Sequence, residues 1–190
     1  MIRTFTGLAF AAAALAATPA LAHVGVGAGS GFAAGFGHPL FGADHLLAMV
    51  TVGLWAGIVG GRALWVWPAA FVAVMAIGGV VAMGGFAIPF VEPAILASVV
   101  VLGVLAALAV RAPVGIGAAL VAGFALFHGH AHGTEIPAAA HGLAYLAGFA
   151  LASAMLIGAG VVAVLAGRSA TLARSLGGLA AIGGAVIAFS

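Results

Sequence analysis

Long apolar stretches separated by short polar breaks run along most of the chain. The breaks contain glycine, proline or arginine. The six apolar stretches between them are Leu40–Val59, Leu64–Phe86, Ala94–Val110, Val114–Gly133, Ala138–Leu165 and Leu172–Phe189. A stretch of about 20 apolar residues can cross a bilayer, and lipid obliges its backbone to satisfy its hydrogen bonds internally. The pattern therefore predicts six transmembrane helices.

Composition makes lipid the solvent for most of the surface. Of 190 residues, 66% are hydrophobic and 4% are charged, whereas a soluble domain carries about 25% charged residues. The five basic residues are too few for the clustered basic face of a nucleic-acid-binding protein. Cysteine is absent, which excludes disulfides and thiolate metal sites. We expect an all-α membrane protein that binds no nucleic acid.

The first 22 residues have the features of a signal peptide. Arg3 gives a basic start, an apolar stretch runs from Leu8 to Ala17, and small residues at Ala20 and Ala22 precede a cleavage position. The pattern predicts a removable signal peptide over residues 1–22 and one six-helix transmembrane domain over residues 23–190. An uncleaved signal anchor is the alternative.

The arginines predict how the chain sits in the membrane. If residue 23 starts outside, the loops after spans one, three and five face the cytoplasm. Those loops hold the remaining four arginines, which are Arg62, Arg111, Arg168 and Arg174. Basic residues favour the cytoplasmic side. We expect a protein of the bacterial inner membrane with both ends periplasmic. Its six helices could be arranged as two groups of three (a 3+3 arrangement).

The histidines and acids gather towards the predicted outer side. All seven histidines and two of the three acids lie there. They are His23, His38, Asp44, His45, His128, His130, His132, Glu135 and His141. An aspartate in a bilayer costs about 2.5–3.5 kcal/mol even on a lenient scale, so intramembrane ionisable groups indicate function. The alternative for any single histidine is a hydrogen bond between helices.

The first cluster surrounds the start of span one. Pro39 suits the first position of a helix, which would leave His38 as a flanking residue. In a straight helix His38 and His45 would lie about 10 Å apart along the axis, too far to share one ion. A break, which Pro39 and Gly42 permit, would bring His38 back towards Asp44 and His45.

The second cluster lies at the end of span four. At about 100° per residue, His128, His132 and Glu135 share one narrow face of a helix, whereas His130 points to the far side. Two histidines four residues apart on a helix form a recognised chelating pair. His130 is therefore a weaker candidate for the same ion.

Glycines suggest how the two clusters meet. Gly129 and Gly133 are four residues apart and allow a neighbouring helix to approach closely. Span one carries a matching series, which is Gly53, Gly57 and Gly61. We expect spans one and four to contact each other, so that both clusters bind one cation near the outer leaflet.

The ligand types restrict the metal without identifying it. Imidazole and carboxylate suit nickel, zinc, copper(II) and iron. Asp44 and Glu135 could neutralise a divalent ion directly or by orienting the imidazoles. The side chains alone do not separate nickel from cobalt or zinc.

Two segments resemble the HupE/UreJ family of nickel permeases. They are His38–Ala56 (HPLFGADHLLAMVTVGLWA) and Phe127–Glu135 (FHGHAHGTE). Five residues separate His38 from Asp44, which is the family spacing, whereas a separate nickel/cobalt transporter family uses four. By this resemblance the metal-binding residues are His38, Asp44, His45, His128, His132 and Glu135. His130 occupies a variable position, and His23 and His141 lie outside both motifs.

The resemblance implies the function that we expect. It implies a permease, not an enzyme, that takes up nickel as its transported substrate, with cobalt as a second candidate and no organic cofactor. The nickel would reach a hydrogenase or urease maturation system, and the chain could form a homo-oligomer.

The sequence leaves two alternative functions open. A non-transporting metal-binding accessory or sensor protein would use the same ligands. An intramembrane metalloprotease would need a glutamate directly after its first histidine, where Gly129 stands instead. A phosphate-binding loop of the Walker type is also missing from the sequence, which argues against ATP hydrolysis within this chain.

Overall fold

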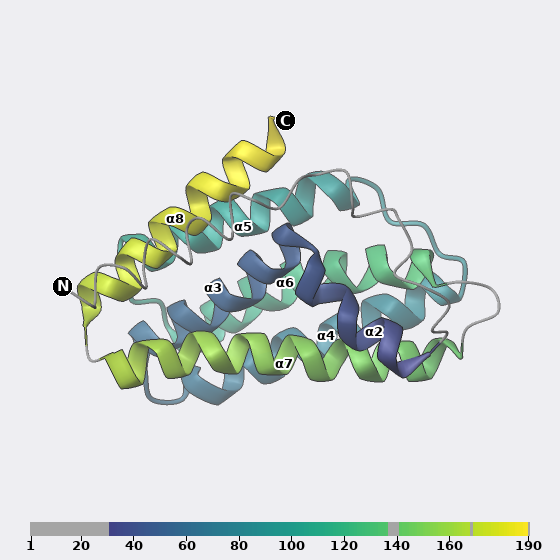
Figure 1. Ribbon diagram of the computed structural model, residues 1–190, viewed down its shortest axis with the longest axis horizontal. Coiled ribbons are helices and arrows are strands. Elements are labelled where there is room, and N and C mark those ends of the chain that lie inside the picture. Colours follow the sequence, from purple (N-terminus) through teal and green to yellow (C-terminus); the bar gives the residue numbers. More distant parts are fainter. Residues whose placement is uncertain (1–30, 137–140, 168, 190) are drawn as a thin grey trace.

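The computed structural model describes residues 31–136, 141–167 and 169–189, and these residues form helices and no strands (Figure 1). The helices are α2 (Phe32–Phe41), α3 (Ala43–Val59), α4 (Ala63–Met83), α5 (Val91–Ala107), α6 (Val114–Glu135), α7 (Gly142–Gly167) and α8 (Ala170–Ala188). The all-α prediction is confirmed for this part of the chain. The expected signal peptide, His23 and Arg168 lie outside the described residues.

Four helices are long and apolar enough to cross a membrane, namely α4, α6, α7 and α8. A fifth crossing arises if α2 and α3, which meet at an angle of 83°, form one broken span. Helix α5 is apolar but has only 17 residues. The structure therefore shows a multi-pass helical membrane protein, and by helix length its described residues fall short of the six spans expected.

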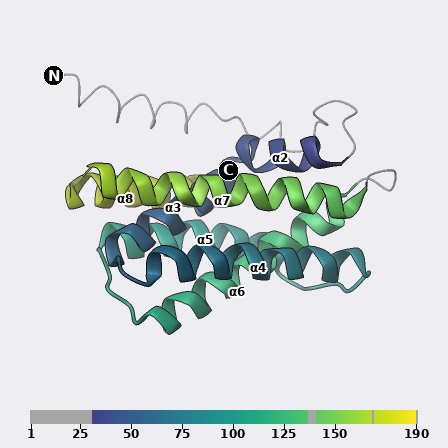
Figure 2. The ribbon, with the colours of Figure 1, turned by 90° about the horizontal axis from the view of Figure 1, so that it is seen from below.

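The start of the first span differs from the expectation. His38 does not flank a helix, because α2 runs through His38 and Pro39 and ends at Phe41. The break falls at Gly42, whose backbone is extended. Helix α2 lies on α7 (Figure 2), where a Cβ at Gly35 would overlap the carbonyl of Tyr145. This close packing stabilises a helix upstream of the stretch that hydropathy detects.

The predicted glycine contact between spans one and four is wrong. A Cβ at Gly129 of α6 would overlap the carbonyl of Met75 in α4, and one at Gly53 of α3 would overlap that of Ile157 in α7. Helix α6 therefore packs closely on α4, and α3 packs closely on α7. Small residues permit close approach but do not specify the partner helix.

The closely packed pairs have defined directions. The residues that meet are Gly53 with Ile157 and Gly57 with Val164 for α3 and α7, Met75 with Gly129 and Gly79 with Gly133 for α4 and α6, and Val99 with Gly184 and Ala106 with Gly177 for α5 and α8. The first two pairs are parallel and the third is antiparallel. In each pair a helix from the α3–α5 part of the chain packs against one from the α6–α8 part, so the two parts form one bundle.

Two tryptophans close the core at the end remote from the histidines. Trp55 and Trp67 are buried, with ring centroids 4.3 Å apart. The indole N–H of Trp55 donates to the carbonyl of Val110 at 2.8 Å, and that of Trp67 donates to the carbonyl of Val114 at 2.9 Å. Both bonds hold the ends of the α5–α6 connection against the helix bundle.

Two charged residues that were expected at the boundaries of spans lie inside helices. Arg174 is inside α8, and its Nε donates to the carbonyl of Ala107 at the end of α5, at 2.9 Å. Glu92 lies in the first turn of α5, where a carboxylate favours the positive end of the helix dipole. Helix α5 begins at Val91 instead of Ala94, and α8 begins at Ala170 instead of Leu172, because charged residues are tolerated in terminal turns.

Candidate metal centre

The bend between α2 and α3 assembles the first half of the site. His38 lies in the last turn of α2, and Asp44 and His45 lie in the first turn of α3. The 83° angle at Gly42 brings the His38 and His45 rings to a centroid separation of 6.2 Å. The broken start that the sequence permits is therefore present, one turn later than Pro39.

Helix α6 contributes the second half from one face. The His132 ring centroid lies 4.4 Å from that of His38 and 4.3 Å from that of His45. The His128 ring lies one turn further back along α6, with its centroid 4.9 Å from that of His45. The structure thus brings together side chains from both sequence clusters, although the backbones of α3 and α6 do not form a glycine contact.

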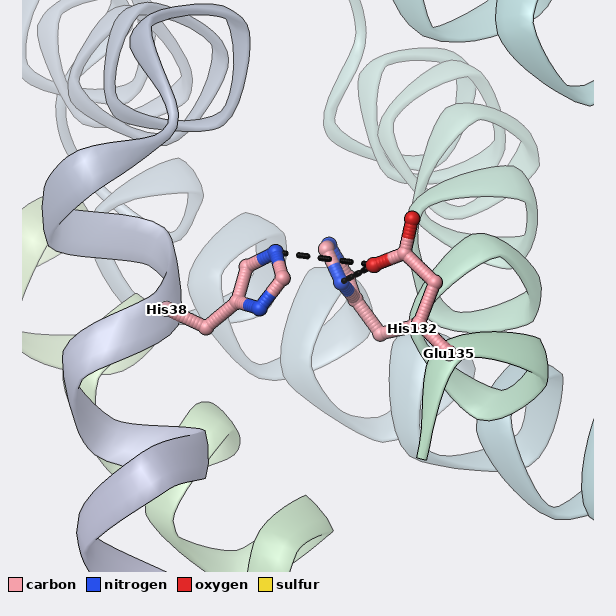
Figure 3. Close-up of side chains that lie close together, drawn as sticks. All are labelled: His38, His132 and Glu135. Atoms are coloured by element: carbon pink, nitrogen blue, oxygen red, sulfur yellow. Dashed lines mark ion pairs between the residues drawn. The ribbon is translucent and has the colours of Figure 1, made fainter. Parts of the chain in front are cut away.

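Three donor atoms converge at the more solvent-exposed end of this cluster (Figure 3). Glu135 Oε2 lies 3.6 Å from His38 Nε2 and 3.5 Å from His132 Nδ1. One ligand atom from each residue lies within 4.8 Å of the others. His38, His132 and Glu135 form what we call the outer triad, which has the donor types and spacing to bind a divalent cation.

Each of three imidazoles has one nitrogen held by a neighbouring side chain. Asp44 Oδ1 lies 2.7 Å from His45 Nδ1, the Tyr145 hydroxyl lies 2.8 Å from His38 Nδ1, and Ser98 Oγ lies 2.9 Å from His128 Nε2. Metal-binding histidines usually have such a partner on the nitrogen that does not bind the metal, since it fixes the ring orientation and the tautomer.

Several other ring nitrogens are buried without a hydrogen-bond partner in the structure. They are His45 Nε2, His128 Nδ1, and both ring nitrogens of His132. The 3.5 Å between His132 Nδ1 and Glu135 is too long for an ordinary hydrogen bond. A buried unsatisfied polar group costs about 1–3 kcal/mol, so a cluster of them calls for an explanation. A bound cation would supply it.

Burial increases from the mouth of the site inwards. The Glu135 side chain is 42% exposed and that of His38 is 28% exposed, whereas His128 and His132 are almost fully buried. Phe149 lies against His132, with a ring centroid separation of 4.1 Å. Glu135 and His38 are therefore the accessible members of the cluster, and the imidazoles of His128 and His132 lie behind them.

The remaining histidines lie elsewhere or outside the described residues. His130 points to the α4–α5 connection, as helical spacing predicts, with its Nε2 2.8 Å from the carbonyl of Phe86 and 3.2 Å from the amide nitrogen of Ile88. Its Nδ1 is also buried without a partner. His141 is exposed just before α7.

Sequence reasoning missed two polar side chains that contact the cluster, Ser98 of α5 and Tyr145 of α7. Both interrupt strongly apolar stretches, and Tyr145 is the only tyrosine in the chain. A polar residue within an apolar span indicates a functional contact, so both residues could have been identified in the sequence. Neither residue lies within the two segments His38–His45 and His128–Glu135, so local sequence patterns do not connect them to the site.

Comparisons with known proteins identify a family that the chain is similar to. The family described as HupE / UreJ protein matches residues 11–187. A curated relative, protein HupE of Rhizobium leguminosarum bv. viciae, is 48% identical over 126 residues. That alignment covers 66% of this chain and 66% of the relative, just under two thirds of each. No solved structure matches the chain.

Proposed function

The chain belongs to the HupE/UreJ family, and from this premise we propose that it is a permease that carries nickel across the bacterial inner membrane into the cytoplasm. Cobalt is the second candidate substrate. The nickel would supply the maturation of a hydrogenase or a urease. The family relationship supports this reading over that of an enzyme.

One observation carries the proposal. Donor atoms of His38, His132 and Glu135, which come from helices far apart in the sequence, lie within 4.8 Å of one another. The buried His45 lies directly behind them, with its ring centroid 4.3 Å from that of His132. Imidazole and carboxylate are ligands that suit nickel.

Capture and release follow from this arrangement. A hydrated ion reaches the partly exposed Glu135 and His38, exchanges water for imidazole and carboxylate, and moves towards the buried histidines. A negative potential inside the cell favours inward movement by about 4.6 kcal/mol per 100 mV for a double charge. Release to the cytoplasm requires that no single station hold the ion too tightly.

The directions of the helix pairs support six crossings. A chain that reverses at every connection from α3 to α8 makes α3 parallel to α7, α4 parallel to α6, and α5 antiparallel to α8. The observed contacts have these three directions. Helix α5 is about 26 Å long, and a bilayer accommodates a span slightly shorter than its core of about 30 Å by local thinning.

The positions of the arginines support an orientation of the chain in the membrane. Arg62 and Arg111 lie in connections at one end of the bundle, and Arg174 bonds to the end of α5 nearby. Positive charges favour the cytoplasmic side. The outer triad then faces the periplasm, together with the start of α2 and the end of α8.

Nickel uptake by the purified full chain in sealed vesicles tests this proposal. With a potential negative inside, we expect radioactive nickel to accumulate in the lumen, and excess cobalt to compete better than magnesium. A non-transporting accessory or sensor protein would bind nickel without filling the lumen. Accumulation no greater than in protein-free vesicles would overturn the permease assignment.

A further inference from the structure

A hydrogen-bond chain from Ile95 fixes the tautomer of His128. Ser98 Oγ donates its single hydrogen to the carbonyl of Ile95 at 2.6 Å. Towards His128 Nε2, at 2.9 Å, the same hydroxyl can therefore only accept. The proton of the neutral imidazole must then be on Nε2, which leaves a lone pair on the buried, unpartnered Nδ1.

Asp44 fixes the tautomer of His45 in the same way. An ionised carboxylate accepts hydrogen bonds and donates none. His45 Nδ1, at 2.7 Å from Asp44 Oδ1, therefore carries the ring proton. The lone pair of the imidazole is then on Nε2, which is also buried without a partner.

His132 connects these two rings to the outer triad. Its Nδ1 faces Glu135 at 3.5 Å, whereas its Nε2 is buried and has no hydrogen-bond partner in the structure. The His132 ring centroid lies 4.3 Å from that of His45, which in turn lies 4.9 Å from that of His128. His128 is four residues before His132, about 6 Å deeper along α6.

We infer that His45, His128 and His132 form a second, inner ion-binding station, with Ser98 as the residue that positions His128. The inference rests on the proposed function, because the inner station takes the same ion from the outer triad. His132 serves both stations, and the ion occupies one station at a time.

The two stations differ in chemistry. The outer triad offers a carboxylate at a partly exposed mouth, which receives an ion that still holds water. The inner station offers only imidazole nitrogens in a dry interior. Imidazole suits nickel, whereas magnesium, calcium and manganese prefer oxygen ligands. The inner station therefore selects against these oxygen-preferring ions.

Two single variants and their combination test for two stations. Glu135→Gln weakens the outer triad, and His128→Ala removes the deepest imidazole. We measure radioactive nickel bound to the full chain in detergent by equilibrium dialysis. Each single variant should still bind one nickel ion per chain, and the double variant should bind about 100-fold more weakly. If either single variant loses as much affinity as the double variant, there is one site and the inference fails.

Ser98 is tested in the Glu135→Gln chain, where nickel depends on the inner station. Ser98→Ala should weaken nickel binding about 10- to 100-fold, as the loss of an orienting partner does. Ser98→Thr, which keeps the hydroxyl, should restore it. The control is Ser153→Ala, since Ser153 is equally buried and its Oγ donates to the carbonyl of Phe149 at 2.7 Å. Equal affinities of the two alanine variants would refute the positioning role.

Failure of this inference is distinguishable from failure of the proposed function. If vesicles with the unaltered chain accumulate nickel but the variants behave as one site, only the inner station is overturned. Vesicles that accumulate none would overturn the permease, whatever the binding measurements give.

Discussion

At the scale of single residues, some side chains of the cluster could bind the ion and others orient the histidine rings. Asp44, Ser98 and Tyr145 each hold one nitrogen of a histidine ring through a short contact. The opposite nitrogen of the His45 and His128 rings is left without a partner inside the protein. Fixing a ring before the ion arrives reduces the ordering that binding must impose.

The central histidines are expected to be essential for transport. His132→Ala removes the ring shared by both stations, and His45→Ala removes a buried imidazole next to it. Nickel accumulation in vesicles should fall more than about 100-fold in each, since a lost ligand should cost at least as much as a lost orienting partner.

His130→Ala provides the matched control for these variants. His130 lies on the same helix but contacts the α4–α5 connection instead of the cluster. Its replacement should leave most of the nickel accumulation intact. If His130→Ala abolished accumulation while His132→Ala did not, the assignment of the helix face would be wrong.

Helical spacing accounts for the part of the site that could be predicted. His128, His132 and Glu135 are on α6 alone, so their common face and the opposite direction of His130 follow from 3.6 residues per turn. The contacts of Ser98 and Tyr145 depend on how α5 and α7 pack. Packing of that kind is not encoded in local spacing, which is why these residues were missed.

At the scale of helices, close glycine contacts determine the position of the helix α6 on which His128 and His132 lie. Gly129 lies between His128 and His132, and a Cβ there would overlap backbone atoms of α4. The close approach of α6 to α4 therefore sets the height and rotation of both histidines. A shift of α6 would move its histidines relative to His45 of α3.

Replacing Gly129 by alanine should damage both stability and transport. The added methyl group overlaps the Met75 carbonyl, and overpacking of this kind costs about 1–3 kcal/mol. Gly123→Ala is the matched control on the same helix, because nothing lies within 4 Å of a Cβ there. Thermal unfolding in detergent should give a lower midpoint for Gly129→Ala only. Equal midpoints would show that the α4–α6 contact does not constrain the fold.

Hydropathy identified most of the helices but not how the first one starts. The apolar stretches predicted α4 to α8 to within a few residues, because burial in lipid needs length and apolarity alone. Helix α2 and its break at Gly42 were placed incorrectly. Their position depends on Gly35 packing against Tyr145, a contact 110 residues away in the sequence.

At the scale of the whole molecule, the metal centre lies at one end of the helix bundle. The histidines of the metal centre lie at one end, and the Trp55–Trp67 pair fills the core at the other. The exposed large side chains of the helices, such as Ile77, Val162 and Ile182, are apolar and suit a lipid environment.

Single cysteines can test the proposed orientation, because the chain has none of its own. Ala87 is exposed in the α4–α5 connection, and Ala166 is exposed near the end of α7. With 26 residues, α7 is about 39 Å long, so its end should emerge from a core of about 30 Å. A membrane-impermeant maleimide should label Ala87→Cys in intact spheroplasts but Ala166→Cys only after permeabilisation. The reverse labelling pattern would show that the chain has the opposite orientation in the membrane.

The central claim is that imidazole and carboxylate groups from α2, α3 and α6 bind one divalent ion. Nickel-edge X-ray absorption of the nickel-loaded full chain tests this claim most directly, because scattering from imidazole rings is distinct from that of water. We predict a nickel shell of nitrogen and oxygen with at least two imidazoles, which is lost in His132→Ala combined with His45→Ala. A spectrum of hydrated nickel without imidazole, unchanged in that variant, would contradict the account.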